Sequence, residues 1–247
     1  MLLIAAALQE ELNVALSLCR DPNRIRRGNV DFWEAARKSR TINFLKTGVG
    51  PVRSAACLER ALRILDVSHI LVLGYAGALD PRLKLGTLVV VRKALFCSID
   101  KTNPAVENMK LEREFVLAPG DALVHASESL RLPVCCGDTI TSSHVWGNPE
   151  HKKILLRKFR ACIVDMETAA LAGVSETARI PLRCIRVVSD EAEDSFLEPF
   201  SYDPSAGMTK RTGLLIRKGN PLKTYGKWKR NASVARERLS RFLYEYL

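Results

Sequence analysis

The hydrophobic and polar positions of this chain follow two alternating patterns. Short, nearly continuous apolar runs predict buried strands, and longer segments with an apolar residue every three or four positions predict helices. The predicted strands cover residues 2–8, 41–47, 69–79, 84–96, 132–142, 161–166 and 182–190. The predicted helices cover residues 9–19, 51–65, a segment from about 149, 167–180 and 231–247. This alternation predicts an α/β fold: a single domain with a mixed central β-sheet flanked by helices.

The pattern fails in one place, between about residues 191 and 222. This stretch holds three prolines, three glycines and mixed charge, and it shows neither the strand period nor the helix period. We expect a divergent loop with one short helix here, because long segments without a period are usually loops. The loop belongs to one expected domain that covers residues 1–247.

Composition narrows the class of protein. The 247 residues are 47% hydrophobic, enough to bury one large core. No apolar run reaches the roughly 18 residues of a membrane span, and the apolar N-terminus lacks the basic start of a signal peptide. Seven cysteines without a CxxC pair fit a reducing compartment, so we expect a cytoplasmic protein. The four histidines lack zinc-ligand spacing, and we expect neither a metal nor a cofactor.

The net charge of +11 is concentrated in a basic C-terminal segment, residues 208–247. This segment holds 11 Lys and Arg against 2 Asp and Glu, a net charge of +9. Basic stretches bind nucleic acids and anionic surfaces, but no nucleic-acid motif surrounds its aromatic residues Tyr225 and Trp228. We therefore expect a solvated or oligomer-facing segment, and nucleic-acid binding is the alternative.

Acidic residues follow three of the predicted strands. Glu10 and Glu11 follow the first strand, Glu167 follows "CIVDM", and Asp190 follows "CIRVVS". The carboxyl ends of strands line the ligand crevice in open α/β sheets, so these segments can bring carboxylates to one place. The alternative for each acid alone is a stabilising position in the first turn of a helix.

Glycines also follow these strands. In "TGVGPVRS", Arg53 stands where the third glycine of a dinucleotide-binding fingerprint belongs, which argues against a dinucleotide cofactor. Glycine lets the backbone approach a ligand closely. We therefore expect Gly48, Gly50, Gly74 and Gly77 to lie beside a small molecule.

Six motifs occur in sequence between Met1 and about Asp190. They are "ALQEEL", "TGVGPVRSA", "GYAGALDPRLKLGTLVV", "GDTIT", "VDMETAALA" and "RVVSD". In this order and spacing the chain resembles the purine nucleoside phosphorylase/nucleosidase superfamily, and most closely the 5′-methylthioadenosine/S-adenosylhomocysteine nucleosidases. The resemblance implies a nucleoside phosphorylase-like fold, a nucleosidase that hydrolyses the N-glycosidic bond of an adenosine-type purine nucleoside, and a homo-oligomer, with a dimer favoured.

The resemblance also implies roles for residues around the scissile bond. Asp190, oriented by Ser189, would protonate the purine at N7, and such an acid needs burial or a like charge to raise its pKa. Glu167 would accept both ribose hydroxyl groups, because one carboxylate can accept two adjacent donors. Met166 would lie flat against the sugar; the alternative is an ordinary core methionine.

Glu11 aligns with the water-activating glutamate of the family, and Arg186 aligns with the arginine that helps to fix the water. An arginine inside an apolar strand needs an anionic partner, and we expect Glu11 to be that partner. The alternative for Arg186 is a structural ion pair. The remaining residues expected at the substrate site are Tyr75, Ala76, Gly77, Ile140, Thr141 and Asp165.

The resemblance leaves hydrolysis and phosphorolysis open. A phosphate site needs arginines and backbone N–H groups, whereas a carboxylate in the same place repels the dianion. Glu11 and Leu73, the latter at a position where phosphorylases of the bacterial hexameric type carry a phosphate-binding arginine, favour hydrolysis. Lys46 and Arg53 keep a phosphorylase with phosphate as co-substrate as the alternative. A further alternative is a non-catalytic nucleoside-binding or nucleic-acid-binding protein on the same fold.

Three departures from the family pattern leave the substrate open. Tyr75 stands where these nucleosidases generally have serine, and Ile140 stands where an aromatic side chain usually stacks on adenine. The segment after Asp190, which in the family closes over the base, differs from the family pattern. Phe196 and Phe200 in this segment are candidates to replace the stacking surface. Methylthioadenosine, adenosylhomocysteine, adenosylhopane-type lipids and futalosine-like nucleosides are all compatible with these residues.

Overall fold

The computed structural model describes residues 1–99, 105–195 and 221–247, with the backbone alone for 221–229. The strands are β1 (Leu2–Ala6), β2 (Arg20–Arg27), β3 (Val30–Arg37), β4 (Arg40–Lys46), β5 (His69–Ala78), β6 (Leu88–Ser98), β7 (Lys110–Val116), β8 (Val134–Thr141), β9 (Ile163–Asp165) and β10 (Leu182–Asp190). The helices are α1 (Gln9–Leu16), α2 (Pro51–Leu62), α3 (Asp121–Ser129), α4 (Pro149–Phe159), α5 (Thr168–Ala178) and α7 (Pro221–Tyr246). Within the described ranges, no helix combines the length and apolar character needed to cross a bilayer.

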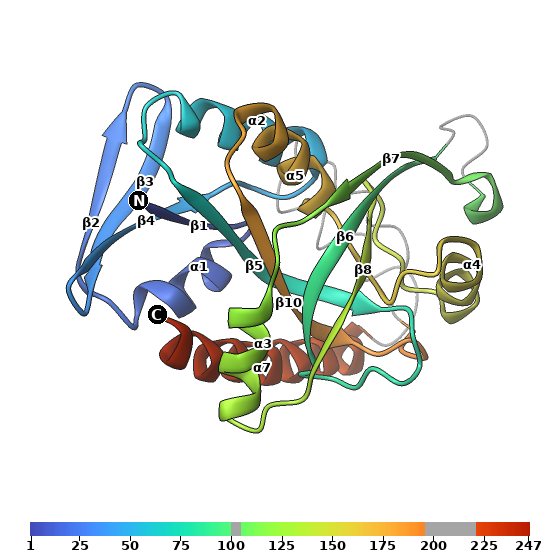
Figure 1. The fold of residues 1–247 in the computed structure, drawn as a ribbon. Coiled ribbons are helices and arrows are strands. Elements are labelled where there is room, and N and C mark those ends of the chain that lie inside the picture. Colours follow the sequence, from blue (N-terminus) through green and yellow to red (C-terminus); the bar gives the residue numbers. More distant parts are fainter. Residues whose placement is uncertain (100–104, 196–220) are drawn as a thin grey trace.

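The described strands form one mixed sheet, part of which closes on itself (Figure 1). β5 pairs with β10, β10 with β6, β6 with β8, β8 with β9, and β9 returns to β5. From β5 the sheet continues through β1, β4 and β3 to the edge strand β2, while β7 pairs with β6. The mixed sheet was predicted, whereas its closure into a ring was not.

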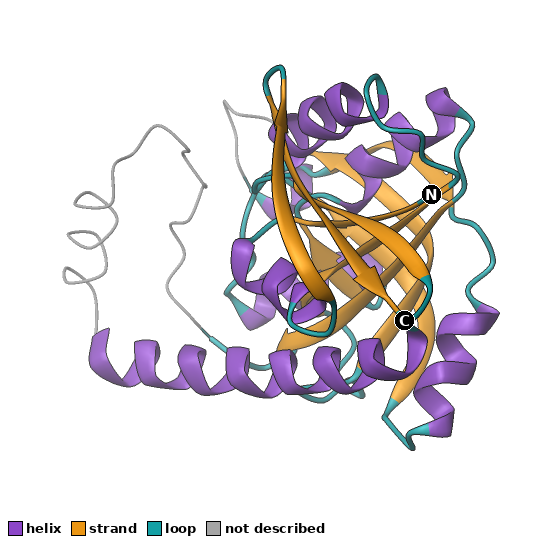
Figure 2. Cartoon of the chain, turned by 90° about the vertical axis from the view of Figure 1, so that its left-hand side faces the viewer, coloured by secondary structure: helices purple, strands orange, loops and turns teal. Residues whose placement is uncertain are grey.

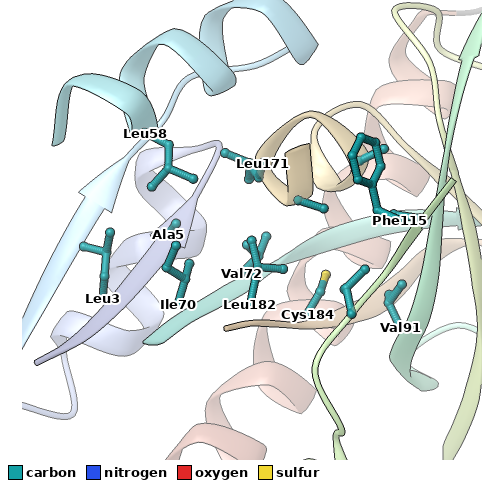
Figure 3. Packing of buried hydrophobic residues seen from close by; sticks show 14 of the residues in the cluster. Leu3, Ala5, Leu58, Ile70, Val72, Val91, Phe115, Leu171, Leu182 and Cys184 are labelled. Atoms are coloured by element: carbon teal, nitrogen blue, oxygen red, sulfur yellow. The ribbon is translucent and has the colours of Figure 1, made fainter. Parts of the chain in front are cut away.

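Helices cover both faces of the sheet, as the sequence predicted. On one face α2 and α5 supply Leu58 and Leu171, which pack over Val72 of β5 and Leu182 of β10 (Figure 3). On the other face α1, α3 and α7 bury a second apolar cluster (Figure 1). Apolar burial on both faces explains why β5 and β10 are nearly continuous apolar runs.

The C-terminal helix α7 is the long helix that lies against β10, α1 and α3 (Figures 1 and 2). Its side chains Ala235, Leu239, Phe242 and Leu243 are fully buried. Their spacing of three to four residues forms the apolar face of an amphipathic helix. One face of residues 230–247 therefore packs on the chain's own core, which the prediction of a solvated or oligomer-facing segment did not include. The charged residues Arg236, Glu237 and Arg241 on the other face are exposed, and an oligomer-facing role stays a prediction.

Strand direction determines where the polar residues gather. β4 and β5 both run parallel to β1, and β10 runs parallel to β5. The carboxyl ends of these four strands therefore lie at one edge of the sheet. Gly50, Glu11, Gly77 and Asp190 lie at or just after those ends.

Candidate active site

Glu11 lies in the first turn of α1, shortly after β1 ends. Its carboxylate accepts hydrogen bonds from the backbone N–H of Leu8 at 2.8 Å and of Tyr75 at 3.0 Å. The residue is only 3% exposed. Burial raises the pKa of Glu11 above its ordinary value, and the charge of Arg186 opposes this rise. Glu11 is thus fixed between the ends of β1 and β5 in an environment that favours proton uptake.

Gly74 allows two of the predicted site residues to approach β5. A Cβ atom at this position would lie 2.5 Å from Arg186 Nη1 and 2.8 Å from Glu11 Oε1. Either contact is closer than real Cβ atoms show, so a larger residue would displace both side chains. Gly74 was predicted to lie beside a small molecule, and this stays a prediction; in the structure it lies against the side chains of Arg186 and Glu11.

Arg186 is fully buried on β10 and is surrounded by acids. Its Nε lies 3.2 Å from Asp165 Oδ2, and its Nη2 lies 3.7 Å from Glu167 Oε2. Nε and Nη2 also donate to the hydroxyl of Thr168 at 3.1 and 2.7 Å. The prediction that Glu11 pairs with Arg186 is wrong, because the ion pairs are made with Asp165 and Glu167. Glu11 acts on Arg186 through charge attraction across Gly74.

Asp165 organises the protein around Arg186. Its carboxylate accepts hydrogen bonds from the hydroxyl groups of Thr141 at 2.7 Å and Thr139 at 3.2 Å. It also accepts from the backbone N–H groups of Glu167 and Thr168, each at 3.1 Å, and from the Thr168 hydroxyl. Because protein donors surround both oxygens, Asp165 is not placed to bind substrate as predicted. It fixes the start of α5 instead.

Glu167 links the turn after β4 to the start of α5. Its Oε1 accepts a hydrogen bond from the backbone N–H of Gly50 at 2.9 Å. Gly50 has a φ of 92°, a conformation that favours glycine and directs its N–H toward this carboxylate. Burial raises the pKa of Glu167 to about 7, with Arg186 opposing the rise and Asp165 adding to it. Met166 lies half-buried beside it.

Asp190 ends β10 and is more exposed than the other two acids. Its Oδ2 accepts a hydrogen bond from Lys152 Nζ at 2.6 Å, and its Oδ1 accepts one from Ser189 Oγ at 3.0 Å. Ser189 Oγ also donates to Ala76 O at 3.3 Å. A Cβ atom on Gly77 would lie 2.9 Å from Asp190 Oδ2, so the end of β5 backs directly against the carboxylate.

The three predicted acids lie around the ends of neighbouring strands. Glu11 and Glu167 both lie within electrostatic reach of Arg186 and of each other. Asp190 lies four residues beyond Arg186 on β10, a span of about 13 Å along a strand, and pairs in register with Gly77. The site therefore has two buried carboxylates at one end and a single carboxylate at the other.

Two predicted substrate-binding residues are placed differently. Ile140 is fully buried in an apolar cluster with Trp146 and Leu155. Thr141 is also fully buried, and its hydroxyl donates to Asp165. Ile140 is therefore part of the core and offers no stacking face, while Thr141 supports Asp165. Substrate contact by the backbone of Ile140 or Thr141 stays a prediction.

Tyr75 is half-buried and packs against the apolar cluster on the side of α1 and α7. Burial, followed by the negative charges of Glu11 and Glu10, raises the pKa of its phenol. The phenol therefore stays protonated as a hydrogen-bond donor. The candidate stacking residues Phe196 and Phe200 lie outside the described residues.

Sequence reasoning missed Lys152 and Thr168. Lys152 lies three and four residues before Leu155 and Leu156, so a helical reading of this segment places its ammonium group on the apolar face. That spacing is a usable signal for a buried lysine. Thr168 adjoins Glu167, and nothing in the sequence singles out its hydroxyl as a partner of Arg186.

These features define a class of protein. An α/β fold gathers two buried carboxylates, a buried arginine and a separate acid at one edge of its sheet, an arrangement suited to acid–base chemistry on a polar small molecule. The family model described as the phosphorylase superfamily matches residues 2–214, and the chain belongs to this superfamily. The predicted resemblance and fold class are confirmed.

Known proteins of similar sequence and structure are nucleosidases and a related hydrolase. The 5′-methylthioadenosine/S-adenosylhomocysteine nucleosidase of Staphylococcus epidermidis is 22% identical over 222 residues, which cover 86% of this chain and 97% of that protein. The structure of the corresponding nucleosidase from Neisseria meningitidis, in complex with methylthio-immucillin-A, has a TM-score of 0.76 at 17% identity, covering 99% of this chain and 97% of that one. Futalosine hydrolase of Helicobacter pylori has a TM-score of 0.76 at 18% identity, covering 99% and 96%.

Proposed function

We propose that this protein is a purine nucleosidase that hydrolyses the N-glycosidic bond of an adenosine-type nucleoside. The observation that carries the proposal is the placement of Glu11, Glu167 and Asp190 at or just after the ends of β1, β9 and β10, the three strands that pair with β5. Glycoside hydrolysis needs an acid on the leaving group and a base on the attacking water. The names of the relatives, nucleosidases and a hydrolase, support the same reaction.

The proposed reaction assigns each acid one task. Asp190, held by Ser189, gives a proton to the purine while the C1′–N9 bond breaks and its electron pair leaves with the base. Glu11 removes a proton from the water whose oxygen bonds to C1′. Glu167 accepts hydrogen bonds from the ribose hydroxyl groups, and Met166 packs against the sugar. The products are the free purine and the free sugar.

The contacts of Arg186 favour water over phosphate as the nucleophile. A phosphate dianion needs unengaged arginine nitrogens and backbone donors. Here Nε and Nη2 of Arg186 are bound to Asp165, Glu167 and Thr168, and Nη1 lies at Gly74 on the side of the Glu11 carboxylate. The buried carboxylate of Glu11 would repel a dianion as well. Phosphorolysis, including that of an adenosylhopane-type substrate, is the alternative outcome.

The substrate belongs to the class of adenosine-type nucleosides, and the particular nucleoside is a further proposal. The relatives are named for methylthioadenosine, adenosylhomocysteine and futalosine. Ile140 is buried, so a stacking partner for the base has to come from another residue. We propose that methylthioadenosine and adenosylhomocysteine are the first substrates to compare.

Product analysis tests the proposal. The protein is incubated with methylthioadenosine, adenosylhomocysteine, adenosine, inosine and futalosine, each with and without phosphate, and the base and sugar are identified. We expect free base and free sugar at a rate that phosphate does not change. Release of a sugar 1-phosphate only when phosphate is present would replace hydrolysis by phosphorolysis. No release of base from any nucleoside would refute both.

Two further features belong to the proposal. We propose a homodimer in the cytoplasm. All seven cysteines are free thiols, which fits a reducing compartment. Sedimentation or light scattering at micromolar concentration tests the dimer.

A further inference from the structure

The side chain of Lys152 is fully buried although it carries a positive charge. It lies on α4, and its Nζ donates to Asp190 Oδ2 at 2.6 Å and to the backbone carbonyl of Glu191 at 2.8 Å. Burying an ammonium group is costly unless it is paired. The partner of Lys152 is Asp190, the acid that gives its proton to the purine in the proposed function.

The next residue on the same helix provides a contrast. Lys153 is exposed, and its Nζ forms a surface ion pair with Glu150 at 2.8 Å. Of these two neighbouring lysines of α4, one is thus buried in the protein and the other is exposed to solvent. The burial of Lys152 is therefore specific to its position on the helix and is not a general property of this basic segment.

We infer that Lys152 is a positioning residue for the acid Asp190, holding its carboxyl group in place and stabilising the carboxylate that forms when the proton moves to the purine. The inference rests on the proposed function. As the C1′–N9 bond breaks, Asp190 loses its proton to the base and becomes negatively charged. An ammonium group 2.6 Å away stabilises that charge as it develops.

Orientation is the second contribution of Lys152. Ser189 Oγ donates to Oδ1 and Lys152 Nζ donates to Oδ2, so each oxygen of Asp190 has its own donor. The donors come from β10 and α4, two elements that are distant in sequence and meet at this carboxyl group. Two donors fix the plane of the carboxyl group, as proton transfer to a ring nitrogen requires.

Among the described contacts, Glu191 and Asp194 near this pair bind other partners. The carboxylate of Glu191 accepts from Lys84 Nζ at 3.2 Å and from the backbone N–H of Leu85 at 3.1 Å. Asp194 accepts from the backbone N–H of Glu191 at 2.8 Å. Among the described groups beside Asp190, Lys152 is the cation in direct contact with the carboxylate.

A positioning role should leave a signature in the kinetic constants. The charge on Asp190 develops as the C1′–N9 bond breaks, so the contact with Lys152 acts in the transition state more than on the bound nucleoside. Its loss should therefore lower kcat while KM stays nearly unchanged.

The test compares Lys152→Met, Lys152→Gln, Lys152→Arg and Lys153→Met with the wild type, using the nucleoside that the wild type cleaves fastest. We expect Lys152→Met and Lys152→Gln to lower kcat roughly tenfold to a hundredfold, with KM within about threefold of the wild type. Lys152→Arg should restore part of kcat. Lys153→Met should match the wild type in both kcat and KM.

A double-mutant cycle separates positioning from a structural role. If Lys152 acts through Asp190, Lys152→Met should have little further effect in an Asp190→Asn background. An unchanged kcat in both Lys152→Met and Lys152→Gln, or an equal loss of kcat in the Asp190→Asn background, would overturn the inference while leaving the nucleosidase proposal intact. A wild type that releases no base would overturn both.

Discussion

Arg186 Nε lies 3.2 Å from Asp165 Oδ2, and both side chains are 1% exposed. The pair joins β10 to β9, next to the start of α5. The hydroxyl of Thr168 bridges the two, because it accepts hydrogen bonds from Arg186 and donates one to Asp165. The buried charge of Arg186 is thus compensated by a residue that holds the backbone rather than by the proposed catalytic glutamate Glu11.

This pair predicts a large loss of stability for Asp165→Asn. Removing one partner of a buried ion pair leaves an uncompensated charge, which costs about 3–5 kcal/mol. The matched control is Asp31→Asn, since Asp31 pairs with Arg24 at 3.3 Å on the surface, where such a pair is worth about 1 kcal/mol at most. Urea unfolding measures both. Equal effects of the two substitutions would contradict the assignment of Asp165 as the main partner of Arg186.

Asp190→Asn should separate chemistry from binding. An amide cannot protonate the purine, and general acid catalysis contributes about a hundredfold or more to the rate. We expect kcat to fall by at least that factor while the Kd for a non-hydrolysable nucleoside analogue stays within a few-fold of the wild type. Asp121→Asn, an exposed acid at the start of α3, serves as the control. An unchanged kcat would remove Asp190 from the mechanism.

The raised pKa of Glu167, about 7, predicts how stability depends on pH. The folded protein holds this proton to higher pH than the unfolded chain, in which a glutamate titrates near 4.5. Unfolding therefore releases a proton between about pH 4.5 and 7, and the free energy of unfolding falls as pH rises through that window. Burial also raises the pKa of Glu11, so its titration lowers the free energy of unfolding with rising pH in the same way.

Urea unfolding at pH 5 and pH 8 checks this sign. Glu167→Gln removes the titration, so the variant should lose less stability between the two pH values than the wild type, by on the order of 2 kcal/mol. Glu59→Gln, which replaces an exposed glutamate on α2, should leave the difference unchanged. An equal change of stability between the two pH values in the wild type and in Glu167→Gln would show that Glu167 does not hold the proton in the folded protein.

The sequence predicted strands well where both faces are apolar and poorly where pairing alone holds the strand. β5, "HILVLGYAGA", is buried along most of its length. β2, "RDPNRIRR", is exposed at seven of its eight positions and forms through its pairing with β3 at the edge of the sheet. Such a strand shows no apolar alternation, so its own residues do not reveal it.

Some residues of the candidate site were likewise predictable from local sequence, and others were not. Glu11, Glu167 and Asp190 were predictable because each follows a strand whose end is visible in the sequence. The contact between Lys152 and Asp190 spans 38 residues and joins a helix to a strand. It depends on how α4 is rotated against the sheet, which local patterns do not specify. The preference of Arg186 for Asp165 over Glu11 depends on tertiary geometry in the same way.

Phe242→Ala tests whether the basic C-terminal segment belongs to the folded core. Phe242 is fully buried on α7, and a buried Phe→Ala change costs about 3–5 kcal/mol. Tyr244, two residues on, is 63% exposed and makes its ring contact with Arg37 at the surface. Tyr244→Ala should cost about 1 kcal/mol at most. Similar melting temperatures for Phe242→Ala and Tyr244→Ala would place α7 outside the cooperative unit.

Asn43→Val should raise stability. Asn43 is fully buried on β4, and neither Nδ2 nor Oδ1 has a hydrogen-bond partner in the described part of the chain. An unpaired buried amide costs about 1–3 kcal/mol, and valine is an apolar residue of similar size that suits a strand.

The contrasting control is Asn148→Ala. Asn148 caps α4 by accepting a hydrogen bond from the backbone N–H of Glu150 at 2.9 Å, so its loss should lower stability by about 1 kcal/mol. Opposite signs for the two asparagines are the expected result of urea unfolding, and a loss of stability in Asn43→Val would mean that the buried amide is stabilised in the folded protein.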